Sequence, residues 1–81
     1  MEYQGRTFAP ILNVVKDRKI ISILEKKLKD GERLVIDTKF APYKGEGYDK
    51  YSVYAFRGKK ETPRFLTCVD LYKLSGRCRV N

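Results

Sequence analysis

The sequence contains no histidine and only two cysteines, Cys68 and Cys78, and these shortages limit the chemistry open to the chain. A nucleophile activated by histidine is impossible without that residue. A structural zinc site needs four thiolate or imidazole ligands, which one chain cannot supply here. The two thiols are interpreted as small buried apolar groups, with a disulfide between them as the alternative. We expect no catalytic residue, no metal and no cofactor.

The chain also lacks a long apolar run. A helix needs about 18 consecutive apolar residues to span a membrane. The segment 1–8, MEYQGRTF, has no charged-then-apolar pattern of the kind that signal peptides show. These absences predict a cytoplasmic protein that makes no contact with a membrane.

The 81 residues predict one small domain that spans 1–81. A chain of this length buries only about 60–65% of its unfolded surface, so a large internal active-site cavity is not expected. Basic residues outnumber acidic ones by 18 to 10, and the net charge is +8. This surplus attracts polyanions and favours DNA or RNA as the partner, although charge that serves only solubility is the alternative.

One amphipathic helix is predicted over Arg18–Asp30. Its apolar residues fall within a narrow arc at 100° per residue, and they are Ile20, Ile21, Leu24 and Leu28, with Ile23 beside them. Asp17 is the expected N-cap and Gly31 the expected residue after the helix.

Strands are predicted around this helix. Runs of apolar, β-branched and alternating residues cover Arg6–Val15, Glu32–Phe40, Lys50–Arg57 and Arg64–Leu74, with a possible short strand at Arg77–Asn81. Pro10 cannot donate to a sheet ladder, so the first strand is expected at an edge or broken there. The order β-α-β-β-β predicts an α+β two-layer domain with an antiparallel sheet of about four strands and the helix on one face.

A catalytic alternative rests on Asp37-Thr38-Lys39 within the second predicted strand. This D-x-K triplet resembles the end of a metal-dependent nuclease pattern, which also needs a second acid preceded by proline. None of the three prolines is followed by an acidic residue. An exposed Asp–Lys pair is therefore the favoured interpretation, and the chain is predicted not to be an enzyme.

The segment Lys39–Arg57 carries most of the aromatic residues, interleaved with cations and a glycine loop at 45–47. Aromatic side chains on a strand can stack on bases while flanking cations pair with phosphates. The alternative is that these aromatics pack in the core and the loop is an ordinary hairpin connection. The predicted nucleic-acid site consists of the cations Lys44, Lys50, Arg57, Lys59 and Lys60 and the tyrosines Tyr43, Tyr48 and Tyr54.

Further cations lie on the predicted helix, and two separate patches of cations would weaken the case for one binding surface.

The sequence supports two hypotheses about function. The first is a non-enzymatic protein that binds nucleic acid mainly through backbone electrostatics. The second is a small protein-interaction module, such as an accessory factor, an inhibitor or a homo-oligomeric subunit, for which a viral origin would be unsurprising. It would bind an acidic protein surface or form a homodimer through an edge strand.

Overall fold

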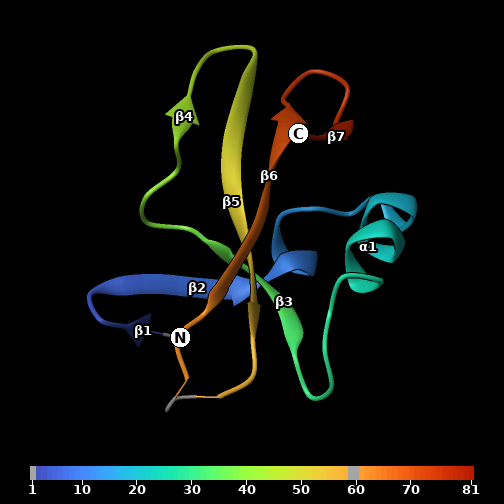
Figure 1. The fold of residues 1–81 in the computed structure, drawn as a ribbon. Coiled ribbons are helices and arrows are strands. Elements are labelled where there is room, and N and C mark those ends of the chain that lie inside the picture. Colours follow the sequence, from blue (N-terminus) through green and yellow to red (C-terminus); the bar gives the residue numbers. More distant parts are fainter. Residues whose placement is uncertain (1, 59–60) are drawn as a thin grey trace.

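The computed structural model describes residues 2–58 and 61–81, which form one antiparallel sheet with a single α-helix (Figure 1). Seven strands build the sheet: β1 (Glu2–Tyr3), β2 (Arg6–Pro10), β3 (Arg33–Asp37), β4 (Tyr43–Lys44), β5 (Tyr48–Phe56), β6 (Arg64–Tyr72) and β7 (Cys78–Val80). Their spatial order is β1-β2-β3-β5-β6-β7, and β4 pairs with β5 as well. The α+β class and the antiparallel sheet are confirmed, whereas the expected number of about four strands is wrong.

The additional strands are short and lie where the sequence predicted turns or ends. β4 is the first arm of a hairpin inside the predicted loop Ala41–Asp49, and Gly45 N donates to Tyr48 O at 3.0 Å to close it. β1 covers two residues and β7 three. Segments this short carry no readable alternation, so only their pairing with a longer neighbour reveals them as strands.

The first predicted strand is interrupted as the proline suggested. β2 ends at Pro10, and Ile11–Asn13 form a 3₁₀-helix, η1. β1 covers part of the outer side of β2, so β1 and β7 are the two outermost strands of the order β1-β2-β3-β5-β6-β7. Ile11 and Val15, predicted as strand residues, instead approach the core from η1 and the segment after it.

The α-helix α1 (Arg18–Glu25) is shorter than the predicted helix Arg18–Asp30. Asp17 caps it as expected, because its Oδ1 accepts from the N–H groups of Lys19 at 3.0 Å and Ile20 at 3.4 Å. The chain then turns, and Glu32 Oε1 accepts from Lys29 N at 2.6 Å. Leu28 still packs against the core from this turn, which explains why the apolar spacing continues past the end of the helix.

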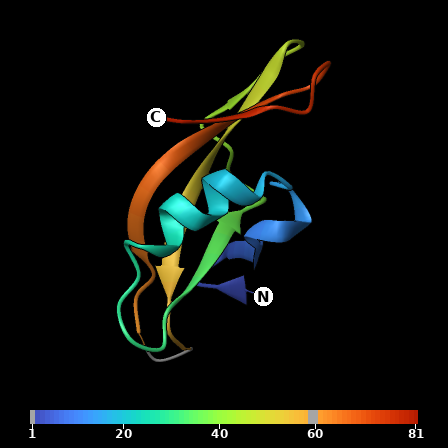
Figure 2. The same ribbon diagram turned by 90° about the vertical axis from the view of Figure 1, so that its right-hand side faces the viewer.

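Two apolar clusters lie on opposite faces of the sheet. The larger one is between the sheet and the two helices, and its buried members are Ile11, Val15, Ile21, Leu24, Leu34, Ile36, Val53 and Val69. Figure 2 shows α1 lying across this face. The smaller cluster, on the other face, contains Phe8, Val35 and Phe56. β5 therefore buries Val53 on one face and Phe56 on the other, which is why the sequence did not reveal a single inward face.

The cysteines also lie on opposite faces. Cys68 pairs with Ser52 across the sheet, while Cys78 pairs with Leu71 and packs against the helix-side cluster. Both are free thiols, so the disulfide alternative is wrong. Burial raises the pKa of the Cys78 thiol, and the nearby Asp17 carboxylate adds to this effect. Neither helix in the described part of the chain is long and apolar enough to cross a membrane.

Candidate functional site

The candidate site is the sheet face turned away from α1, at the end where β4, β5 and β6 lie side by side. Alternation along β5 places Tyr48, Lys50 and Tyr54 on this face, because the intervening Tyr51 and Val53 contact the helix-side cluster. Cross-strand pairing adds Tyr43 opposite Lys50, Tyr72 opposite Tyr48 and Phe65 opposite Tyr54. We call these six residues, Tyr43, Tyr48, Lys50, Tyr54, Phe65 and Tyr72, the aromatic face.

Three tyrosines from three strands form a row at one end of the aromatic face, in which the first two rings are stacked and the third is tilted. The ring centroids of Tyr43 and Tyr48 are 4.8 Å apart with an interplanar angle of 26°. Those of Tyr48 and Tyr72 are 5.5 Å apart at 39°. Tyr43 is the outermost ring and is 45% exposed, so one ring is available for a ligand to stack on.

Gly45 makes room for this row. A Cβ built at Gly45 would lie 2.6 Å from Cε1 of Tyr43, too close for the ring to keep its place. A Cβ at Gly47 meets no atom within 4 Å. The first glycine of the loop is therefore required by the position of Tyr43, whereas the second is not.

A second aromatic group lies at the other end of the aromatic face, around Tyr54 and Phe65. Their rings meet edge to face with centroids 5.6 Å apart, and Phe65 is 55% exposed. Tyr54 lies six positions after Tyr48 along β5, which is about 20 Å of extended chain. The two exposed aromatic groups thus lie at the two ends of one strip of sheet.

Between the two groups lie charged side chains. Lys50 Nζ is 4.0 Å from Oδ1 of Asp70, which also accepts from Asn81 Nδ2 at 3.0 Å. Arg79 of β7 is directly opposite Asp70, which places a second cation beside Lys50 on this face. Lys50 therefore pairs with a largely buried carboxylate, and Arg79 adds a second cation to this face from the neighbouring strand.

An ion pair between the buried Asp37 and the partly exposed Arg6 holds the second aromatic group in place. Asp37 is 1% exposed, and its Oδ2 accepts from Arg6 Nε at 3.2 Å. The guanidinium of Arg6 also donates to the Tyr54 hydroxyl and lies 4.5 Å from the centre of the Tyr54 ring. Oδ1 of Asp37 accepts from the backbone N–H groups of Lys39 and Phe40, both at 3.0 Å. Asp37, the acid of the D-x-K triplet, is thus a buried structural group, and the expected exposed Asp–Lys pair is wrong.

The structure brings together four of the eight predicted site residues: Tyr43, Tyr48, Lys50 and Tyr54. Lys44 pairs with Asp49, and its side chain therefore belongs to the opposite side of the sheet from Tyr43. Arg57 follows β5 at its far end and forms an exposed ion pair with Glu61 at 3.6 Å. Lys59 and Lys60 lie outside the described residues.

Sequence reasoning missed Phe65, Tyr72 and Arg79. All three join the site through cross-strand pairing with β5 or β6, and the register of that pairing is not readable from one strand alone. The cations of α1, such as Lys19, lie beyond the other face of the sheet, so the basic residues form two separate patches. Within residues 2–58 and 61–81, no group of three or more acidic, cysteine or histidine side chains is arranged to hold a metal ion.

Comparisons of the chain with protein-family models, with curated proteins and with solved structures found no match.

Proposed function

We propose that this protein binds single-stranded nucleic acid through the aromatic face. The observation that carries the proposal is the row of rings Tyr43–Tyr48–Tyr72, placed next to Lys50 on the sheet face opposite α1. Unpaired bases stack on exposed aromatic rings regardless of sequence, and neighbouring cations pair with the phosphates. Duplex bases are already stacked on one another, so this arrangement favours single strands.

The net charge of +8 supports the same proposal, because it draws a polyanion towards the protein from any direction. Lys50 and Arg79 then place positive charge where the aromatic rings are. The D-x-K triplet adds no catalytic role, since Asp37 is buried against Arg6. Binding without catalysis is therefore the proposed activity.

The decisive experiment is fluorescence anisotropy with labelled single-stranded DNA, RNA and duplex DNA at low and near-physiological salt. We expect single strands to remain bound at the higher salt and to bind more tightly than the duplex. Removing one stacking ring is worth about 1–3 kcal/mol per base, so Tyr43→Ala is expected to weaken binding by roughly fivefold or more. Because Tyr43 is 45% exposed, this change has little effect on folding.

Two charge-reversal variants distinguish binding at the aromatic face from binding that depends only on the net charge of the protein. Lys50→Glu and Lys19→Glu change the total charge equally, but Lys19 is on α1, on the other side of the sheet. We expect Lys50→Glu to weaken binding much more than Lys19→Glu does. Equal effects would show that binding follows net charge alone. Absence of binding at physiological salt would favour the second hypothesis, a protein-interaction module.

A further inference from the structure

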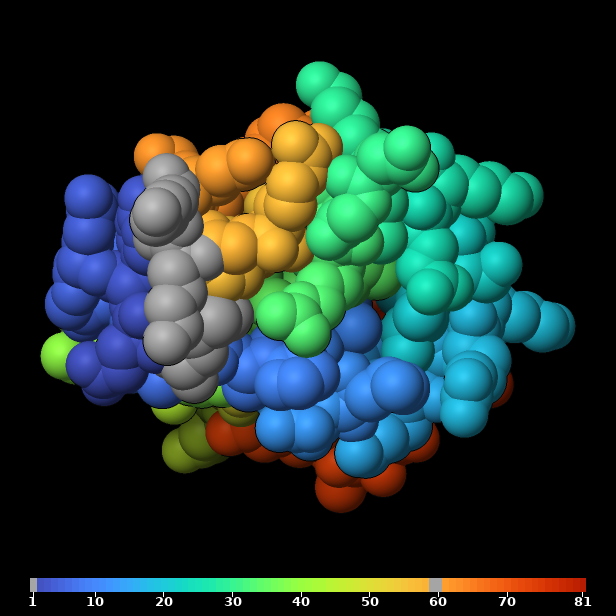
Figure 3. Space-filling model, turned by 90° about the horizontal axis from the view of Figure 1, so that it is seen from below, coloured from blue at the N-terminus to red at the C-terminus, as the bar shows by residue number. Residues whose placement is uncertain are grey.

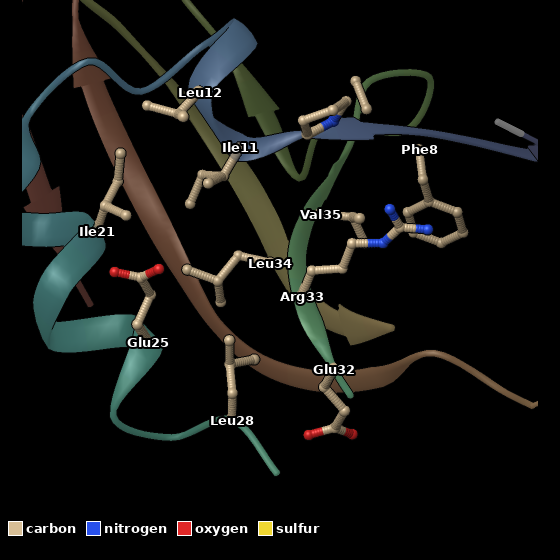
Figure 4. Close-up of a pocket in the computed structure, with 12 residues that line it drawn as sticks. Phe8, Ile11, Leu12, Ile21, Glu25, Leu28, Glu32, Arg33, Leu34 and Val35 are labelled. Carbon is tan, nitrogen blue, oxygen red and sulfur yellow. The ribbon is translucent and has the colours of Figure 1, made fainter. Parts of the chain in front are cut away.

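A groove of about 470 Å³ lies at the opposite end of the sheet from the tyrosine row, between α1, η1 and β3 (Figure 4). Its apolar side chains come from these three elements and from the turn after α1, and they include Ile11, Leu12, Ile21, Leu28, Leu34 and Val35. In the view from below, the blue η1 segment, the teal helix and the green β3 segment meet at this part of the surface (Figure 3). Its volume is in the range of sites that take small ligands or a few side chains of a partner.

The groove exists because β2 stops early. Pro10, opposite Val35, is the last residue of β2, and the chain then leaves the sheet as η1. Arg33 and Leu34 pair with β5 on one side, but in the described part of the chain no strand lies beside them on the other. β3 thus presents a short strand edge at the floor of the groove.

Side chains from both faces of β3 border this groove. Leu34 belongs to the helix-side cluster, while Val35 belongs to the cluster on the opposite face. A compact ligand between two layers would contact one face only. A chain that continues the sheet beside β3 would place alternate side chains on the two faces, as the lining does.

Two charged side chains at the groove indicate which charges a bound segment must carry. Glu25 is exposed at the end of α1, and Figure 4 shows its carboxylate between Ile21 and Leu34. Arg33 pairs with Phe56, so it lies with Val35 on the other face. Neither forms an ion pair with another described residue, in contrast to the neighbouring Glu32, which Arg64 holds at 2.8 Å. The helix side of the groove is thus acidic and the other side basic.

We infer that the groove binds an extended segment of another protein, which adds a strand beside β3. The segment carries apolar residues at alternate positions, a basic residue that faces Glu25 and an acidic residue that faces Arg33. This site is independent of the aromatic face, and it makes the protein an adaptor with one surface for nucleic acid and another for a polypeptide.

The test uses a pair of fluorescein-labelled hexapeptides and anisotropy with the full chain. In Leu-Glu-Lys-Val-Leu-Val, alternation places Lys and Glu on opposite faces of the strand, and the register that turns the two Leu side chains to the helix side of the groove turns Lys to Glu25 and Glu to Arg33. In Leu-Lys-Glu-Val-Leu-Val the charges are exchanged and the composition is the same. We expect the first peptide to bind at least tenfold more tightly than the second. An N-methylated version of the first peptide, which cannot pair as a strand, is expected to lose binding.

Charge reversal in the protein makes the test specific to the groove. The double variant Glu25→Lys, Arg33→Glu is expected to reverse the preference between the two peptides. Both positions are exposed, so the variant is not expected to alter folding. The matched control Arg18→Glu, Glu61→Lys exchanges the same charges at exposed positions outside the groove and should leave the preference unchanged.

Three outcomes would overturn the inference. They are equal affinity for the two peptides, full binding of the N-methylated peptide, and a preference that the double variant does not reverse. A mass measurement tests the other possible occupant of the groove, a second copy of this chain. If the protein is a dimer that the double variant dissociates, the groove is filled by a second copy and the proposed partner is wrong. Peptide binding does not depend on nucleic acid, so failure here leaves the proposed function standing.

Discussion

The two faces of the sheet use the same strands for different purposes. On the helix side, α1 and η1 close over a continuous apolar cluster, in which Val53 and Leu24 are both 0% exposed. On the opposite face only the end near β2 is closed, by packing of Phe8, Val35 and Phe56. The other end keeps aromatic rings and charged groups at the surface. The comparison shows that an aromatic side chain is buried where another element packs over its face of the sheet, and that its hydrophobicity alone does not decide this.

The largest effect is expected on the helix side. Leu24→Ala leaves a cavity in the core and should lower the free energy of unfolding by about 2–5 kcal/mol. Ile23 is the neighbouring residue on α1 and is 49% exposed, so Ile23→Ala should cost less than about 0.5 kcal/mol. Urea denaturation of both variants measures the difference. Similar losses for the two would show that α1 does not cover the sheet through Leu24.

On the other face, the buried Asp37 should matter more than exposed ion pairs do. Asp37→Asn keeps the shape but weakens the contacts to Arg6 and to the backbone N–H groups, and we expect a loss of about 1–3 kcal/mol. The control Glu61→Gln removes the exposed partner of Arg57 and should cost under about 1 kcal/mol. Equal stability of the two variants in urea denaturation would contradict a structural role for Asp37.

A smaller and more local effect is expected at the tyrosine row. Gly45→Ala should displace the Tyr43 ring, whereas Gly47→Ala should leave it in place. Chemical shifts of the Tyr43 and Tyr48 ring protons report this displacement directly. Under the proposed function, Gly45→Ala also weakens binding of a single strand by about 1 kcal/mol, the lower end for one stacked base. Unchanged ring shifts would refute the stacking geometry, whatever the binding result.

The smallest effect concerns Glu32. Hydrogen bonds from Arg64 and from Lys29 N lower the pKa of Glu32 from 4.5 to about 2. Since the pKa is lower in the folded state, the stabilisation is fully present above about pH 4.5 and is lost as the pH falls towards 2. Glu32→Gln should therefore lower the melting temperature slightly at pH 7, and the difference from wild type should shrink towards pH 2. A difference that is independent of pH would exclude this linkage.

The main parts of the fold were predictable where the sequence carries a strong periodic or capping signal. Asp17 was predicted as the N-cap and is one, and Ile20, Ile21 and Leu24 of α1 face the core, whereas Ile23 is exposed. The end of the helix was not predictable, because Leu28 keeps the helical spacing from within a turn. β1, β4 and β7 were missed because strands of two or three residues show no alternation and form only against a partner.

Four of the six residues of the aromatic face were among those predicted from the sequence. Tyr43, Tyr48, Lys50 and Tyr54 were chosen from their density in one segment, and that segment does form the centre of the surface. Tyr72 and Phe65 belong to it through the register of β5 with β6, which includes a bulge between Val53 and Tyr54. A shift of one residue would send every side chain of β6 to the other face.

Composition and periodicity by themselves determined the class of the domain, its positive charge and the position of its helix. These depend on local spacing and on residue counts, which the chain carries whatever its fold. Only the tertiary structure decided which face each aromatic residue occupies, that the two cysteines are kept apart, and that a groove opens where β2 leaves β3. These features depend on strand register and on which element covers which face, and both are set by contacts between residues distant in the sequence.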